Sequence, residues 1–184
     1  MTGTTTYIAF LRAVNVGGRT VKMERLRALF AELGLGEVRS YIQSGNVFFS
    51  TAETDRAALT ARIEQHLEQA LGYAVPVLLR TVEEISELVE ADPFAGVEVT
   101  PEVRLCVLFL SEPLPDGLEL PIRSAKGDWE IIGATPGAAF TVLHLRGGRM
   151  TTNPATTFPK SYRGHATSRF FHTTVKILAA ARKP

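Results

Sequence analysis

The sequence predicts an α+β protein with a ferredoxin-like split βαβ N-terminal subdomain packed against a smaller α+β C-terminal subdomain that ends in a helix. In the first half, strand-length apolar runs and helically spaced apolar residues follow in the order strand, helix, strand, strand, helix, strand. Five prolines then fall between Pro93 and Pro121, which disfavours long helices and marks a boundary. We therefore divide the chain into residues 1–92 and residues 93–184.

The first strand and helix are indicated by a change of period. Residues 7–11 form a continuous apolar run, and the glycine-rich residues 12–19 interrupt it. From Val21 the apolar residues recur at helical spacing, and Gly34 stands where a helix end favours positive φ. This pattern predicts a strand, a glycine loop and a helix.

A β-hairpin is predicted next. Residues 38–43 and 46–50 are two strand-like runs, joined around Ser44 and Gly45. Apolar side chains alternate onto both faces of these strands, so we expect a sheet that is covered on both sides.

The second helix and the fourth strand complete the N-terminal subdomain. Residues 50–53 (Ser-Thr-Ala-Glu) have capping-box spacing, which predicts a helix that ends at Gly72. Residues 75–79 form a short apolar strand. Thr81 and Glu84 have the same capping-box spacing and predict a further brief helix.

The C-terminal subdomain is predicted to hold three strands, a long loop and one helix. Residues 103–110 are an apolar strand, and residues 129–133 and 138–145 are two more across a Thr-Pro-Gly turn. Residues 146–164 have no apolar period and predict a loop, whereas residues 167–181 predict the final helix.

Charge is distributed unevenly along the chain. There are 20 basic and 19 acidic side chains, so the net charge is +1, which argues against a globally basic nucleic-acid binder. No acid follows Glu130, but eight cations do: Arg146, Arg149, Lys160, Arg163, Arg169, Lys176, Arg182 and Lys183. Together with many hydroxyls, these donors suit phosphate or carboxylate groups. The alternative is that they balance the more acidic first half as a solvated surface.

The predicted final helix has one polar and one apolar face. Helical spacing places Arg169, His172, Thr173 and Lys176 on the polar face, with Arg169 in the first turn, where an anion is favoured. The core is expected to receive the apolar residues Phe171, Val175 and Leu178. An ordinary amphipathic helix with its polar face in water is the alternative.

Several classes of protein are excluded or disfavoured. The longest apolar runs are far short of the ~18–20 residues that cross a bilayer, and residues 1–6 lack the character of a signal peptide, so we expect a cytoplasmic protein with no membrane partner. The single cysteine, Cys106, excludes an internal disulfide. It lies in an apolar strand, and we expect a buried, unreactive thiol with a raised pKa. The histidine spacing predicts no metal site, and no motif predicts a cofactor.

Three segments resemble the bacterial family called domain of unknown function 1697. They are residues 7–18 (Tyr-Ile-Ala-Phe-Leu-Arg-Ala-Val-Asn-Val-Gly-Gly), residues 41–48 (Tyr-Ile-Gln-Ser-Gly-Asn-Val-Phe) and the segment that starts at residue 166 (Ala-Thr-Ser-Arg-Phe-Phe-His-Thr-Thr-Val-Lys). In the last segment the family pattern is Thr-Arg-Asn-Trp-Asn-Thr, and Phe170, Phe171 and His172 replace its Asn, Trp and Asn. The resemblance implies an α+β fold with a ferredoxin-like N-terminal subdomain, and no activity.

The leading functional hypothesis is a pocket for a small anionic ligand at the subdomain junction. Glycines before a helix let backbone N–H groups approach an anion, and the hairpin carries amides. The candidate ligand-binding residues are Arg12, Asn15, Gly17, Gly18, Gln43, Asn46, Arg169, Thr173 and Lys176. Two alternatives are a nucleic-acid module that uses the basic C-terminal segment and a protein-interaction domain.

Overall fold

The structure, a computed structural model, describes residues 3–12, 14, 18, 20–156, 158 and 161–184. The fold is α+β and contains two antiparallel sheets. The chain forms two compact units, one made of Met1–Glu87 with Ile177–Pro184 and the other of Leu88–Lys176. The last helix therefore contributes residues to both units.

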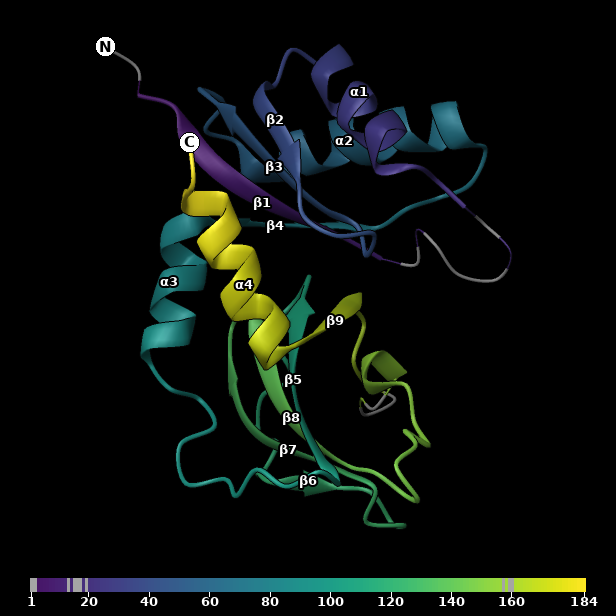
Figure 1. The fold of residues 1–184 in the computed structure, drawn as a ribbon, viewed down its shortest axis with the longest axis vertical. Helices are drawn as coiled ribbons and strands as arrows, with labels where there is room; N and C mark the ends of the chain where they lie inside the picture. The colour runs from purple at the N-terminus through teal and green to yellow at the C-terminus, as the bar shows by residue number, and fades with distance from the viewer. Residues whose placement is uncertain (1–2, 13, 15–17, 19, 157, 159–160) are drawn as a thin grey trace. The chain divides into compact units, whose positions relative to one another are not determined.

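The first unit is built on a four-stranded sheet (Figure 1). Its elements are β1 (Thr5–Leu11), α1 (Met23–Glu32), β2 (Gly36–Ser40), β3 (Asn46–Thr51), α2 (Arg56–Leu71), β4 (Val77–Thr81) and the start of α3 (Val82–Glu90). The strand order is β2-β3-β1-β4, and each neighbouring pair is antiparallel. The order strand, helix, strand, strand, helix, strand is the one that the sequence predicts, and the hairpin turn lies where it was expected.

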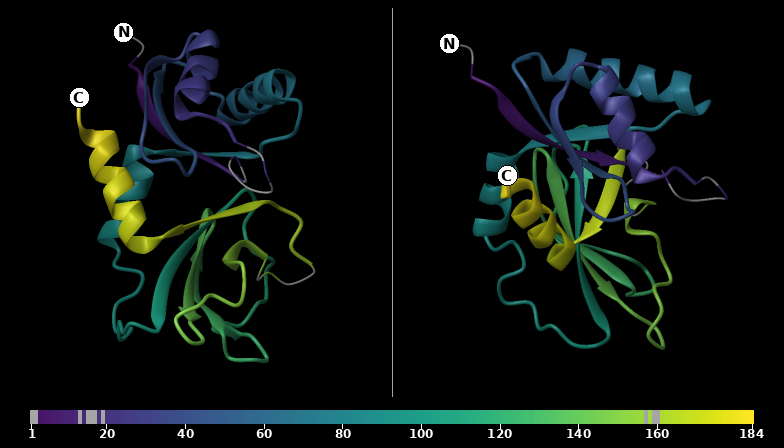
Figure 2. Two further views of the ribbon diagram at one scale, coloured as in Figure 1. Left: turned by 45° about the vertical axis from the view of Figure 1, so that its right-hand side comes forward. Right: turned by 45° about the horizontal axis from the view of Figure 1, so that its top comes forward.

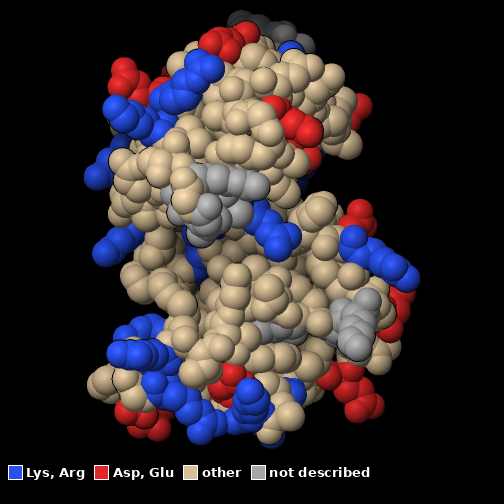
Figure 3. Space-filling model, turned by 90° about the vertical axis from the view of Figure 1, so that its right-hand side faces the viewer, with Lys and Arg blue, Asp and Glu red and all other residues tan. Residues whose placement is uncertain are grey.

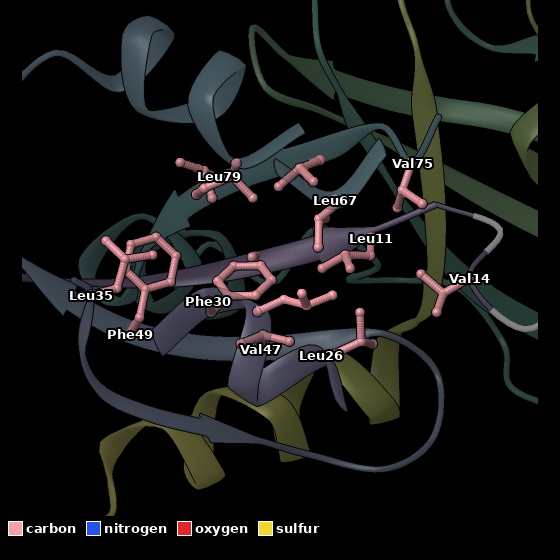
Figure 4. Close-up of a cluster of buried hydrophobic side chains, with 14 of the residues drawn as sticks. Leu11, Val14, Leu26, Phe30, Leu35, Val47, Phe49, Leu67, Val75 and Leu79 are labelled. Atoms are coloured by element: carbon pink, nitrogen blue, oxygen red, sulfur yellow. The ribbon is translucent and has the colours of Figure 1, made fainter. Parts of the chain in front are cut away.

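Apolar side chains are buried on both faces of this sheet. Alternate residues of β1, Tyr7, Ala9 and Leu11, belong to the core cluster that also includes residues of α1 and α2 (Figure 4). The residues between them, Ile8 and Phe10, are fully buried as well. Each large apolar side chain buried in this way contributes about 1.5–3 kcal/mol to folding.

The start of α2 corrects one expectation from the sequence. The predicted capping box at residues 50–53 is wrong, because β3 continues through Thr51. The N-cap is Asp55, whose carboxylate accepts a hydrogen bond from the backbone N–H of Ala58 at 3.0 Å. The helix ends as predicted at Gly72, which adopts the left-handed conformation (φ 83°).

The second predicted capping box is confirmed at the start of α3. The Glu84 backbone N–H donates to Thr81 Oγ1 at 3.1 Å, and the Thr81 N–H donates to Glu84 Oε2 at 3.0 Å. Glu84 also accepts two hydrogen bonds from the guanidinium of Arg56 in α2. The Glu84 carboxylate therefore caps the start of α3 and also links α3 to α2.

The second unit is built on a five-stranded antiparallel sheet (Figure 2). Its elements are the rest of α3, β5 (Val103–Leu110), β6 (Ile122–Arg123), β7 (Trp129–Thr135), β8 (Ala138–His144), the 3-10 turn η1 (Pro154–Thr156), β9 (Ala166–Phe170) and the first half of α4 (Phe171–Arg182). The strand order is β6-β7-β8-β5-β9. The three predicted strands are present, whereas β6 and β9 were not predicted.

The predicted start of the final helix is wrong. Residues Ala166–Phe170 form β9, which pairs with β5 so that Arg169 lies opposite Val107, and α4 begins only at Phe171. Pairing along β5 supplies backbone hydrogen bonds that outweigh the local helical spacing of the apolar residues. The buried stripe of α4 is also narrower than predicted, since Leu178 is buried but Val175 is 40% exposed.

Candidate functional site

Hydrogen bonds among its own residues hold the hairpin turn between β2 and β3. Asn46 is fully buried, and its side-chain amide donates to the carbonyl of Tyr41 at 3.2 Å and to Ser44 Oγ at 2.9 Å. Gly45 has a φ of 79°, and a Cβ there would lie 3.2 Å from the Cβ of Leu11. Only glycine satisfies both the positive φ and this close approach. These residues therefore have a structural reason to be present.

The same turn brings two of the sequence motifs together at one end of the first sheet. The Leu11 N–H donates to the Gly45 carbonyl at 2.9 Å, and the N–H of Arg12 donates to the Pro76 carbonyl at 3.0 Å. Gln43 is exposed in the turn, and Gly18 is exposed farther along the first loop, with a φ of 81°. Two other candidates, Asn15 and Gly17, lie outside the described residues. Ligand binding by these groups stays a prediction.

Arg169 is a strand residue with most of its side chain buried. It is 8% exposed, and its guanidinium donates to Thr167 Oγ1 at 2.9 Å and to the Ser168 carbonyl at 2.8 Å. Burial lowers the pKa of Arg169 to about 10, so it stays charged at neutral pH. The expected grouping with Thr173 and Lys176 on one helix face is wrong, because only those two lie in α4.

Cys106 is buried in β5, as the sequence predicts. It is 1% exposed, and burial raises the pKa of its thiol to about 12. A thiol that stays protonated at neutral pH is a poor nucleophile. Slow reaction of the native protein with a thiol reagent stays a prediction.

A hollow in the second unit was not predicted from the sequence. Its volume is about 740 Å³, within the range of ~300–1,000 Å³ that is common for small-molecule sites. It is lined by Ser124, Ala125, Lys126, Asp128, Trp129, Arg146, Thr151 and Thr152. The turn before β7, the first residue of β7 (Trp129) and the segment after β8 supply these residues.

Asp128 forms the polar centre of this hollow. The residue is 7% exposed, and its carboxylate accepts hydrogen bonds from the hydroxyls of Ser124 (2.5 Å), Thr151 (3.0 Å) and Thr152 (2.6 Å). These bonds, that from Ser124 first, hold the pKa of Asp128 well below its usual range, so the carboxylate stays ionised. Thr151 and Thr152, which belong to the segment without acidic residues, thus donate hydrogen bonds to an acid that precedes this segment in the sequence.

Lys126 and Arg146 line the hollow with this carboxylate, and Arg149 lies opposite Arg146. Arg146 and Arg149 exchange backbone hydrogen bonds of 3.0 and 3.1 Å across Gly147 and Gly148, which both have positive φ. Such a two-residue turn sets the two arginines directly opposite each other. The Arg146 guanidinium also donates to the backbone carbonyl of Lys126. All three cationic residues are exposed. Figure 3 shows basic side chains, with acidic ones among them, along the bottom of the face that it presents.

Arg146 and Arg149 are like charges that lie opposite each other across this turn. Like charges directly opposite each other on paired strands are destabilising. Lys126 and Arg146 line the hollow together with one carboxylate, Asp128, which keeps its negative charge while it accepts from three hydroxyls, so the lining has one excess positive charge. The sequence signal that could have indicated the site is Arg-Gly-Gly-Arg at residues 146–149, since paired glycines favour such turns.

The described residues offer neither a metal cluster nor a membrane span. Within the described ranges, no group of three or more His, Cys, Asp or Glu side chains could hold a metal ion. Among the described helices, none is long and apolar enough to cross a bilayer.

The chain is thus an α+β protein with two antiparallel sheets and a ligand-sized hollow in its second unit. It belongs to the family described as "Protein of unknown function (DUF1697)", whose model matches residues 4–139. This membership confirms the resemblance that the sequence motifs indicate. Arg146 and Arg149 lie beyond the matched residues.

A solved structure has a similar fold over the whole chain. It is reported as the structure of conserved bacterial protein SP0830 from Streptococcus pneumoniae. The two chains are 25% identical, with a TM-score of 0.71, and the match covers 98% of this chain and 100% of that one. No curated protein matches the sequence.

Proposed function

We propose that the protein binds a small anionic ligand, with a phosphate or carboxylate group, in the hollow around Asp128 and Arg146. The observation that carries the proposal is the juxtaposition of Arg146 with Arg149 and with the backbone of Lys126. Guanidinium groups bind planar or tetrahedral oxyanions through paired hydrogen bonds, and an ammonium adds a point charge. An anion there would relieve the repulsion between the two opposed arginines.

The remaining lining residues would shape the site for the rest of the ligand. Trp129 is half-buried and offers an indole surface for a ring or an apolar group. Asp128, through Thr151 and Thr152, fixes the segment that follows the two arginines. This support keeps the backbone in place before a ligand arrives, which lowers the entropic cost of binding.

We also infer that the first unit has the ferredoxin-like topology. The element order β-α-β-β-α-β and the sheet order β2-β3-β1-β4 support this inference. The ligand position predicted from the sequence, at the subdomain junction, stays a separate prediction with its own residues.

A phosphate titration tests the proposed function. The melting temperature of the full chain is measured against inorganic phosphate, with chloride adjusted to hold ionic strength constant. A ligand that binds only the folded state must raise the melting temperature. We expect Arg146→Ala to weaken phosphate binding about 10- to 100-fold, because a charge-assisted hydrogen bond is lost.

Arg62→Ala is the matched control, since Arg62 is an exposed arginine that pairs with Glu53 in the first unit. It should leave the phosphate effect unchanged. An equal phosphate effect in wild type and Arg146→Ala contradicts the proposal. If Arg12→Ala or Arg169→Ala abolishes the effect instead, the ligand site is the one predicted from the sequence. Binding of a single-stranded oligonucleotide with steep salt dependence would favour the nucleic-acid alternative.

A further inference from the structure

A second hollow lies beside strand β2 of the first unit. Its volume is about 430 Å³, and its lining residues come from α1, β2, β3 and the end of α4. They are Arg27, Val38, Arg39, Ser40, Phe48, Ala180 and Lys183. All of them belong to the first unit.

The hollow follows the outer edge of β2. Successive strand residues point to opposite faces of a sheet. Val38 packs against the helix-side core and Ser40 accepts a hydrogen bond from Arg27 of α1 at 2.5 Å, whereas the Arg39 guanidinium lies over the ring of Phe48 at 5.5 Å. Because residues on both faces line it, the hollow must border the strand at its edge.

That edge has no neighbouring strand among the described residues. β2 is the outermost strand in the order β2-β3-β1-β4, and in the described part of the chain it pairs with β3 alone, with a register shift between Gly36 and Arg39. An edge strand presents unpaired N–H and C=O groups to whatever lies beside it. A ligand in the hollow would therefore meet backbone hydrogen-bonding groups as well as side chains.

The lining is cationic. Three of its residues, Arg27, Arg39 and Lys183, carry positive charge, and none carries negative charge. Arg39 donates to the carbonyls of Ala180 and Ala181, both at 3.1 Å, so its guanidinium is held in place at the end of α4.

The acid of β2 lies outside the lining of the hollow. Glu37 accepts a hydrogen bond from Ser50 Oγ at 2.9 Å and does not line the hollow. The cations along the edge therefore lack an acidic neighbour within the lining.

We propose that the edge of β2 binds an extended acidic segment of a partner protein, which adds to the sheet as a further strand. Backbone pairing would supply affinity, and the flanking cations would select acidic side chains. The lining holds three cations and no acid, so an acidic segment complements it, whereas a second β2 edge carries both Glu37 and Arg39. Charge complementarity thus identifies a partner of opposite charge.

The test uses a capped, fluorescent seven-residue peptide of alternating valine and glutamate, and binding is followed by fluorescence anisotropy. We expect the peptide to bind, and we expect a lysine-for-glutamate version not to bind. A third version carries N-methyl groups on the amides of one edge, which removes strand pairing but keeps the charge. We expect its affinity to fall at least tenfold.

Variants of the protein locate the site. Lys183→Glu should lower the affinity for the acidic peptide at least tenfold. Arg62→Glu, which makes the same charge change on α2, should lower it much less. Circular dichroism of each variant checks that the fold is kept. Arg146→Ala should bind the peptide normally, so failure here is distinguishable from failure of the proposed phosphate site.

Three results would overturn the inference. The first is absence of binding by the acidic peptide. The second is equal affinity of the N-methylated peptide, since this would reduce the interaction to charge alone. The third is an equal loss in Lys183→Glu and Arg62→Glu, which would place the peptide elsewhere.

Discussion

Thr141 carries a hydroxyl into the middle of the second sheet. It is fully buried between Cys106 and Ile131 on the neighbouring strands, and in the described part of the chain its Oγ1 has no hydrogen-bond partner. Burying a polar group costs desolvation free energy, and without a hydrogen-bond partner nothing offsets that cost. We therefore expect Thr141→Val, which keeps the shape of the side chain, to raise the free energy of unfolding by about 1 kcal/mol. Urea denaturation measures this change.

The matched control for this prediction is Thr174→Val in α4. Thr174 is just as buried, but its Oγ1 donates to the Phe170 carbonyl at 3.0 Å. The same substitution there removes a hydrogen bond and should lower stability. An equal loss of stability in both variants would contradict the prediction. It would mean that the Thr141 hydroxyl, like that of Thr174, makes a hydrogen bond that the substitution removes.

Residue environments could be predicted from the sequence where neighbours along the chain decide them. Cys106 lies between apolar residues of one strand, and its burial follows from that alone. Asp128 gave no such signal, because its partners Thr151 and Thr152 are 23 and 24 residues away in the sequence. No local pattern indicates that a carboxylate will be enclosed by hydroxyls from a distant loop.

At the scale of the elements, the capping box of α3 offers a direct test. Thr81→Ala removes the hydroxyl that accepts from the Glu84 N–H, so we expect the free energy of unfolding to fall by about 1 kcal/mol. Thr60→Ala in α2 is the control, because that hydroxyl donates back to the Arg56 carbonyl and caps no free N–H. Chemical denaturation of the two variants side by side gives the comparison. An unchanged stability in Thr81→Ala would show that Glu84 and Arg56 hold the start of α3 without the cap.

Elements were predictable where local spacing and tertiary pairing agree. β5 begins and ends at the predicted residues, since an eight-residue apolar run can be buried on both faces. Ala166–Phe170 has a helical spacing of apolar residues, yet it is β9, because pairing with β5 decides its conformation. The partner strand lies more than fifty residues earlier, and a window of local sequence does not contain it.

On the scale of the whole molecule, long-range hydrogen bonds compensate for missing secondary structure. Residues 146–164 contain only the short turn η1 among helices and strands in their described part. Asp128 fastens this segment to the start of β7 through Thr151 and Thr152, and Tyr162 fastens it to the end of β5 by donating to the Glu112 carbonyl at 2.9 Å. The sequence predicts the loop, whereas these anchors, and with them the candidate site, require the tertiary fold.

The anchor at Asp128 makes the stability of the molecule depend on pH. Its pKa is lowered in the folded state by the Ser124, Thr152 and Thr151 hydroxyls, so the unfolded chain takes up the proton first as the pH falls. The stabilisation is therefore complete above the usual aspartate pKa of about 3.9 and is lost as the pH falls below it, towards the lowered folded value.

Asp128→Asn keeps the size but turns an NH₂ group towards hydroxyl donors, so we expect lower stability at pH 7. The difference from wild type should shrink below about pH 4, where the wild-type carboxylate becomes protonated on unfolding. Urea denaturation from pH 7 to pH 2.5 measures it, with Asp55→Asn as a control because asparagine caps a helix as well as aspartate does. A difference between Asp128→Asn and wild type that stays constant across this range would mean that the ionised carboxylate does not hold the segment in place.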